Sequence, residues 1–175
     1  SPSSKIHGKD IPAAGKANFE QRLGQDYDLQ QPGEIGRVGE EVSPYTRKPL
    51  GITYPKVDVD QLYPAIEAAM PAWRDASVET RTGICLEILD RCSTQLFENA
   101  HATMHTAGQS YIMAFAGSGA NALDRGLEAL AYAYQAMKDV PESAEWERTF
   151  GGDGTAKLSK HYKLMPRGVS VAICC

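Results

Sequence analysis

The last eleven residues of the chain constrain its fold most strongly. Residues 165–175 read Met-Pro-Arg-Gly-Val-Ser-Val-Ala-Ile-Cys-Cys, an apolar run that begins at a Pro-Arg-Gly turn. Such a run is typical of a parallel strand buried in a sheet that helices cover on both faces. A buried strand needs neighbouring strands to pair its backbone donors and acceptors, and the sequence shows none after it. We therefore expect the front part of a larger α/β protein.

The sequence divides into four parts, and the first two differ in their content of Pro and Gly. Residues 1–57 carry Pro or Gly every few positions, which predicts a loop-rich N-terminal arm with one short helix over 12–22. Two short strands are expected in this arm, over 39–45 and 50–55, on either side of a Thr-Arg-Lys-Pro turn. Residues 58–140 form the second part, and the pattern there is helical.

Apolar residues at helical spacing predict four helices in the second part. The first is capped by Asp58 or Asp60 and the second by Ser77, since these side chains can accept a hydrogen bond from the first helical turn. The third ends at Gly108, a residue type that favours the left-handed conformation after a helix. The fourth is expected to break at Gly117-Ser118-Gly119, because glycine disfavours a helix interior.

The rest of the chain predicts strands. Residues 141–166 form a third part, a β-hairpin in which β-prone runs flank the turn Gly151-Gly152-Asp153-Gly154. Residues 167–175 form the fourth part, the first core strand of a domain whose remainder is not in the sequence. The predicted fold class is therefore α/β, in the order arm, helices, hairpin and core strand.

The composition excludes several partners. The net charge is −4 and no block of Lys and Arg occurs, so we expect no nucleic-acid partner. No stretch has the length and apolarity of a membrane span, so we expect no membrane partner. The cysteines lack the spacing of a zinc site or a disulfide framework, which favours buried free thiols and the cytoplasm. They are Cys85, Cys92, Cys174 and Cys175.

Three short patterns resemble known site motifs but lack essential residues of them. His101 and His105 have the i, i+4 spacing of zinc ligands on a helix, but the glutamate of H-E-x-x-H and a third ligand are missing. We therefore expect surface or capping histidines and no metal. Gly117-Ser118-Gly119 follows no strand and lacks the third glycine of a dinucleotide fingerprint. The glycine-rich turn at 151–154 lacks the Lys-Ser/Thr of a phosphate-binding loop.

Residues 59–108 resemble the N-terminal helices of the aldehyde dehydrogenase superfamily, which has an Ala-rich helix ending in Trp, an Arg-led helix and a Thr-Gly turn. The matching residues are Ala65-Ile66-Glu67-Ala68-Ala69-Met70-Pro71-Ala72-Trp73, Arg81 and Thr106-Ala107-Gly108-Gln109. Residues 166–173 resemble the Pro-x-Gly-Val strand that begins the superfamily's Rossmann-type cofactor domain. One branch, the phenylacetic acid degradation protein of the PaaN type, is similar over nearly the whole chain. The sequence segments that carry this similarity are 38–45, 54–60, 84–89, 104–109 and 124–134.

The resemblance implies an NAD(P)-dependent oxidation of an aldehyde to an acid. In that chemistry a cysteine thiolate attacks the aldehyde, hydride passes to NAD or NADP, and a glutamate activates water. The aldehyde of the PaaN-type branch is expected to be a ring-opened semialdehyde linked to CoA. The catalytic Cys and Glu are expected beyond residue 175, so this chain would carry no catalytic residue and be inactive alone. The hairpin would serve oligomerisation, as a homodimer or homotetramer.

Four residues are candidate site residues under this resemblance. By position on the first core strand, Ile173, Cys174 and Cys175 would contact the cofactor. Arg125 would meet an anionic group of the substrate, although a solvated arginine beside Asp124 is the simpler explanation. Two alternatives stay open: the chain is a stand-alone helical and hairpin module that binds or oligomerises, or a hydratase or other domain is fused further along.

Overall fold

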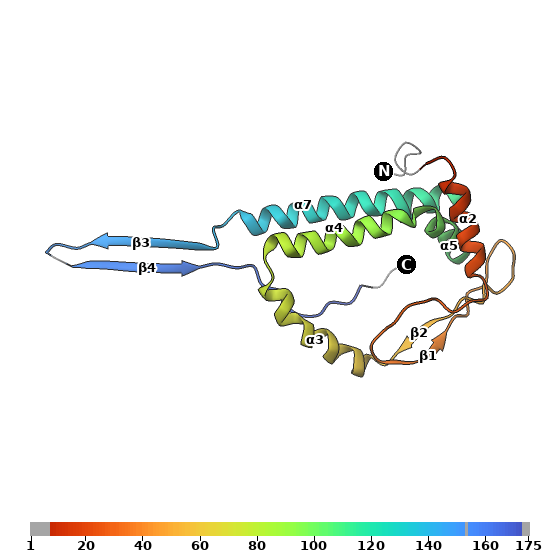
Figure 1. Cartoon of the computed structure of the whole chain (residues 1–175), viewed down its shortest axis with the longest axis horizontal. Coiled ribbons are helices and arrows are strands. Elements are labelled where there is room, and N and C mark those ends of the chain that lie inside the picture. Colours follow the sequence, from red (N-terminus) through yellow and green to blue (C-terminus); the bar gives the residue numbers. More distant parts are fainter. Residues whose placement is uncertain (1–7, 153, 173–175) are drawn as a thin grey trace.

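The structure is a computed structural model that describes residues 8–152 and 154–172. Helices α4 and α7 run along its long axis, with α2 and α5 at one end and a hairpin projecting from the other (Figure 1). Within the described residues, no helix is long and apolar enough to cross a membrane. The elements are α2 (Ile11–Arg22), β1 (Glu34–Val38), β2 (Tyr54–Val57), α3 (Val59–Asp75), α4 (Val78–Thr94), α5 (Leu96–Ala107), α6 (Tyr111–Ala114), the π-helix η1 (Phe115–Asn121), α7 (Ala122–Lys138), β3 (Ser143–Thr149) and β4 (Thr155–His161).

Helices α4 and α7 lie side by side and pack on each other (Figure 1). α4 begins where the sequence predicts, because the Ser77 side chain accepts a hydrogen bond from the backbone N–H of Thr80 at 3.0 Å. Gly126 of α7 brings the two helices close together. A Cβ at this position would lie 2.8 Å from Cδ2 of Leu89 on α4.

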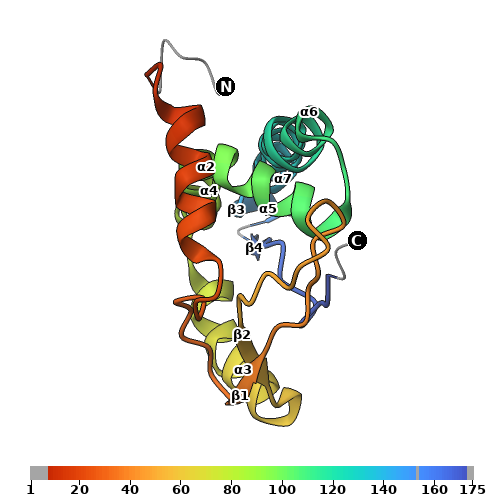
Figure 2. The same ribbon diagram turned by 90° about the vertical axis from the view of Figure 1, so that its right-hand side faces the viewer.

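Helix α2 packs across α5 (Figure 2). The predicted helix over 12–22 is confirmed, with a start one residue earlier. Gly15 of α2 permits the contact, because a side chain there would overlap Phe97 and stand 2.9 Å from the backbone nitrogen of Glu98. α5 ends at Gly108 as predicted, and this glycine adopts the left-handed conformation with φ 71°.

The predicted helix break at Gly117-Ser118-Gly119 is wrong. α6, η1 and α7 follow one another without a gap, and the glycines lie in a π-helical turn. Gly119 is buried against α5, and a Cβ there would come within 3.1 Å of Leu96 Cδ2. Gly119 therefore allows close packing on α5, whereas Gly117 is exposed with no atom within 4 Å of a Cβ, and the helix continues through both as a π turn.

The strands predicted over 39–45 and 50–55 are wrong in position. β1 and β2 pair antiparallel, with Val38 opposite Tyr54, so β1 lies wholly before the first predicted segment and β2 overlaps the second only at residues 54–55. Between them only an isolated bridge joins Val42 to Pro49. Ser43 explains the difference, because its side chain and backbone close a polar turn in place of a ladder.

Helix α3 begins at the predicted cap, where the Asp58 side chain accepts from the N–H of Asp60. It carries an apolar stripe, yet none of its residues is buried in this structure. Ile66 and Trp73 are 39% and 37% exposed. The stripe thus forms an apolar face that the described residues do not cover and that is exposed to solvent.

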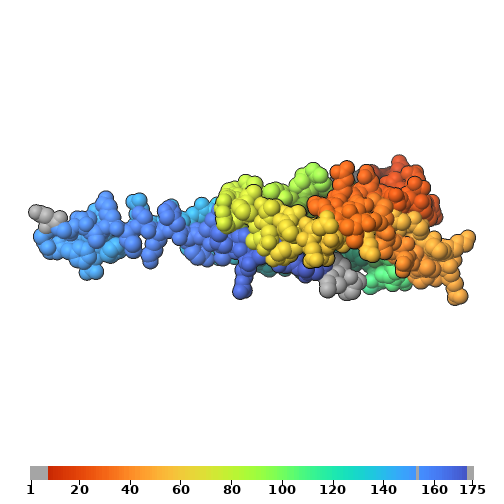
Figure 3. All heavy atoms as spheres, turned by 90° about the horizontal axis from the view of Figure 1, so that it is seen from below, coloured from red at the N-terminus to blue at the C-terminus, as the bar shows by residue number. Residues whose placement is uncertain are grey.

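The predicted hairpin is confirmed. β3 and β4 pair antiparallel in unbroken register, from Ser143 opposite His161 to Thr149 opposite Thr155. The hairpin projects beyond the ends of the helices as a thin arm (Figures 1 and 3). Trp146 and Leu158 face each other across it and remain half exposed.

The predicted strand over 167–175 is not formed in its described part, 167–172. These residues pair with no strand among those described, and Val171 is 84% exposed. The physical reason is that a strand needs a neighbouring backbone to satisfy its donors and acceptors. The apolar character that favoured burial is present, but the described chain offers no strand to pair with it.

The buried core is small for a chain of this length. It gathers mainly at the α2–α5 end, around Phe19, Leu50 and Ile52. The accessible surface is 12783 Å², whereas a compact protein of this mass exposes about 8,400 Å². Large apolar areas of the helices and the hairpin are therefore open to solvent.

Candidate functional site

The densest group of ionisable and aromatic side chains lies where α2, α5 and the turn at 43–48 meet. His101 and His105 stand one turn apart on α5, and both rings stack on Phe19 of α2, with centroids 6.3 and 5.1 Å away. The Tyr111 ring lies 4.6 Å from that of His101. Both imidazoles are half-buried. The prediction of surface or capping histidines is therefore corrected: these rings are part of the packing.

Ser43 fixes the orientation of His105. It is fully buried, and its Oγ lies 2.7 Å from Nδ1 of His105. The same Oγ accepts hydrogen bonds from the backbone nitrogens of Tyr45 and Thr46, at 3.3 and 3.2 Å. Its single proton therefore points at His105, which ties the turn to α5.

The environment of His101 disfavours a charged imidazole. Burial is the largest cause that lowers the pKa of His101, and the positive charges of Lys16 and His105 lower it further. No cluster of three or more potential metal ligands occurs in the described part of the chain. The group holds one hydroxyl beside a base, that of Ser43, but Ser43 is fully buried and already accepts two backbone hydrogen bonds, so we assign it a structural role.

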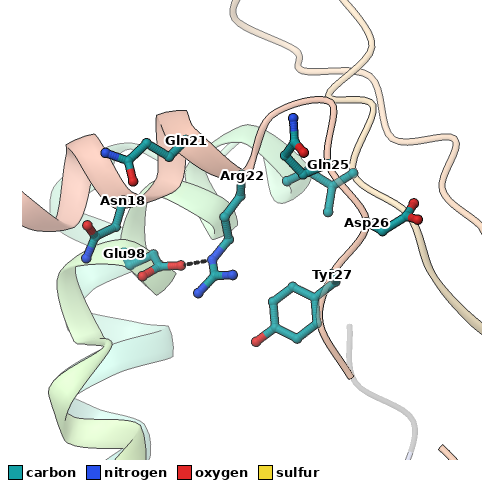
Figure 4. A pocket seen from close by; sticks show the side chains of 8 residues that line it. Asn18, Gln21, Arg22, Gln25, Asp26, Tyr27 and Glu98 are labelled. Atoms are coloured by element: carbon teal, nitrogen blue, oxygen red, sulfur yellow. Dashed lines mark hydrogen bonds and ion pairs between the residues drawn. The ribbon is translucent and has the colours of Figure 1, made fainter. Parts of the chain in front are cut away.

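A polar cavity of about 430 Å³ lies between α2 and α5, next to the segment that follows α2. Figure 4 shows Arg22 between the carboxylate of Glu98 and the ring of Tyr27. The guanidinium donates to Glu98 and lies 5.1 Å from the Tyr27 centroid. The hydrogen bond to Glu98 is the largest cause that raises the pKa of Arg22. Side-chain amides of Asn18 and Gln21 complete one wall (Figure 4).

No motif in the sequence predicts this polar cavity. Arg22 and Glu98 are 76 residues apart in the chain and neither belongs to a motif. Only the packing of α2 on α5 brings them together.

The predicted substrate residue Arg125 lies on the exposed surface of α7. Its guanidinium pairs with Glu128 one turn further along the same helix. Asp124, its neighbour, lines a shallow cavity between α4 and α7, which Arg125 does not line. Contact between Arg125 and a substrate stays a prediction.

The predicted cofactor residues, Ile173, Cys174 and Cys175, lie outside the described residues. Their role stays a prediction. Of the other two cysteines, Cys85 is half-buried and Cys92 is exposed, and both are free thiols. Free thiols are therefore confirmed for this pair, but the expectation of burial is wrong for Cys92.

Arg81, the arginine at the start of α4, is buried and 7% exposed. One of its terminal nitrogens donates to the carbonyl of Leu164 at 3.4 Å, which links α4 to the segment that leaves the hairpin. Its Nε and the Oγ1 of Thr82 are buried without a hydrogen-bond partner among the described residues. Unpaired buried groups of this kind are uncommon in complete folds.

One solved structure shows what this arrangement is similar to. The crystal structure of an NAD-dependent aldehyde dehydrogenase from Burkholderia multivorans matches the chain with a TM-score of 0.87 at 41% sequence identity. The match covers 95% of this chain and 30% of that dehydrogenase, so the chain spans about a third of its length. No protein-family model and no curated protein matches the chain. The predicted fold class, that of an N-terminal aldehyde dehydrogenase segment, is confirmed, and the resemblance to the superfamily is supported.

Proposed function

We propose that the chain is a segment of an NAD(P)-dependent aldehyde dehydrogenase that contributes helical scaffold and an oligomerisation hairpin but no catalytic residue. The observation that carries this proposal is the match to the Burkholderia multivorans dehydrogenase over 95% of the chain at 41% identity. When bound, NAD or NADP would accept the hydride that the aldehyde loses. The residues expected to contact the cofactor, 173–175, lie outside the described part of the chain, so we assign the described residues no step in hydride transfer.

We further propose a role in phenylacetate catabolism, on a ring-opened aldehyde linked to CoA. The support is the set of sequence segments that resemble the PaaN-type branch. Two of these segments, 38–45 and 104–109, are distant in the sequence but are joined by hydrogen bonds in the fold. Ser43 contacts His105, and the Tyr45 hydroxyl donates to the carbonyl of Gln109 at 2.7 Å. The two segments thus pack together as one unit.

The exposed surface supports the proposal that the chain is a segment of a larger enzyme. The apolar faces of α3 and of the hairpin are open, and Arg81 retains an unpaired buried nitrogen. A larger dehydrogenase in the cytoplasm, assembled as a dimer or tetramer, would cover such surfaces. The second candidate is a stand-alone module that binds or oligomerises, and the projecting hairpin is the observation that favours it.

The experiment is a comparison of two polypeptides by absorbance of the reduced cofactor. One is this 175-residue chain, and the other is the complete product of the gene that encodes it. We expect aldehyde-dependent formation of NADH or NADPH from the complete product and none from the chain alone. Turnover by the 175-residue chain would refute the proposal that this chain carries no catalytic residue. Absence of turnover with any aldehyde in a longer, folded product would favour the stand-alone module.

A further inference from the structure

A cavity of about 510 Å³ opens between α2, α5 and the turn at 43–50. Its volume falls in the range of sites that hold small molecules. It lies on a different face of α2 from the cavity of Figure 4, because Lys16 and Glu20 line this cavity whereas Asn18 and Arg22 line the other. Its chemistry differs as well, because apolar groups form most of its walls.

The floor of this cavity is apolar and belongs to the buried core. Phe19 and Leu50 are 3% and 6% exposed and belong to the buried core. Leu23 and Met104 add apolar wall above them. The floor is therefore formed before any ligand arrives, which reduces the entropy that binding would cost.

The two imidazoles supply polar atoms at the edge of this floor. His105 accepts the Ser43 proton at Nδ1, so in its neutral form the other nitrogen, Nε2, carries the proton and is a donor. Nε2 of His105 makes no hydrogen bond to any described residue, and neither do the ring nitrogens of His101. Both side chains line the cavity. A ligand atom that accepts hydrogen bonds would find partners here.

The charge at the rim is positive. Lys16 and Lys48 both line the cavity. Glu20 also lines the cavity, and its carboxylate lies 3.7 Å from the ammonium group of Lys16 in an exposed pair, so these two charges offset each other. Lys48 makes no ion pair with the described residues. A negative group at the rim would therefore meet an ammonium group and the imidazole donors together.

We propose that this cavity binds a small carboxylate with an apolar, preferably aromatic, body. The body would lie over Phe19 and Leu50, and the carboxylate would face Lys48 and Nε2 of His105. The site is separate from the surfaces invoked for the proposed dehydrogenase, and it does not depend on that function.

Proton NMR of the histidine rings tests the proposal in the full chain. The chain has four histidines, His7, His101, His105 and His161, so the ring signals can be assigned with single His→Gln variants. Naphthalene-2-carboxylate is the probe, because its ring current shifts nearby protons strongly. At a pH where the imidazoles are neutral, we expect saturable shifts for His101 and His105 and none for His161.

A pair of lysine variants tests the role of charge. Lys48→Met should weaken binding of the carboxylate about two- to fivefold, the range for one partly exposed ion pair. Lys56→Met on β2, which makes the same charge change outside the cavity, should leave the affinity unchanged. For the neutral analogue naphthalene-2-methanol, Lys48→Met should have no effect.

Three results would overturn the proposal. The first is the absence of saturable shifts at His101 and His105 with millimolar probe. The second is an equal loss of affinity in Lys48→Met and Lys56→Met, which would indicate general charge attraction. The third is equal binding of the alcohol and the carboxylate, which would leave an apolar cavity without a carboxylate site.

Discussion

Gly15 sets how closely α2 approaches α5. Alanine is the better helix former by about 1 kcal/mol, but a Cβ at Gly15 would overlap Phe97 and the backbone nitrogen of Glu98. Backbone atoms cannot rotate away as a side-chain end can. We expect Gly15→Ala to lower the free energy of unfolding by about 1–3 kcal/mol, the range for overpacking, measured by urea denaturation.

Gly83 provides the matched control. It lies inside α4, is exposed, and a Cβ there would have no atom within 4 Å. Gly83→Ala should therefore raise the free energy of unfolding by up to about 1 kcal/mol through helix propensity alone. A stabilising effect of both substitutions would show that α2 does not pack on α5 as described.

His101 should make stability depend on pH. Its pKa is lowered in the folded chain, by burial first and then by Lys16 and His105. As the pH falls through about 6.5, the ordinary pKa of histidine, the unfolded chain takes up a proton that the folded chain resists. The contribution of His101 to the free energy of unfolding is therefore complete above that pH. It declines below that pH, by at most about 1.4 kcal/mol per pH unit for one proton.

Urea denaturation at several values between pH 8 and 5.5 measures this decline. The window avoids the carboxylates Asp75 and Glu79, whose pKa values are lowered by hydrogen bonds to Arg74 and Lys138 and which titrate at lower pH. The His101→Gln variant cannot take up the proton and should show a shallower dependence. An unchanged slope in that variant would assign the effect to another group.

The hairpin has two unlike faces. Trp146 and Leu158 are opposite each other on one face, while Glu145 and Ser159 are opposite each other on the other. An isolated two-stranded hairpin is marginally stable in water, so a covering partner is expected for the apolar face. We predict that Trp146→Lys combined with Leu158→Lys weakens self-association of the chain, measured by sedimentation velocity.

Ser159→Lys is the control for this prediction, because it adds a charge to the polar face of the same strand. It should leave the sedimentation profile unchanged. Equal disruption by both variants would show that charge on the hairpin matters and that its apolar face does not. A wild-type chain that stays monomeric at all concentrations would contradict self-association through the hairpin.

The elements that the sequence predicted well are those with local signals. Asp58 and Ser77 cap their helices, Gly108 ends one, and the glycine-rich turn marks the hairpin. The failures concern residues whose role depends on distant partners. Gly119 was interpreted as a break because its contact with Leu96 cannot be seen in the sequence. The pairing of Arg22 with Glu98, which shapes the polar cavity, was hidden for the same reason.

The molecule as a whole exposes about half as much surface again as a compact protein of its mass. The projecting hairpin and the open face of α3 account for its extended outline (Figure 3). A compact chain of 175 residues has a radius of gyration of about 16 Å. We expect small-angle X-ray scattering of the monomer to give a clearly larger value. A value near 16 Å would mean that the hairpin folds back on the helices.

The placement of the two tryptophans has a consequence for spectroscopy. Trp73 lies on α3 and Trp146 on the hairpin, and they are 37% and 50% exposed. Neither belongs to the core around Phe19. The intrinsic fluorescence of the chain therefore reports on its two open apolar faces more than on its interior. A blue shift of the emission would signal that a partner has covered one of these faces, and unfolding of the core would change the emission little.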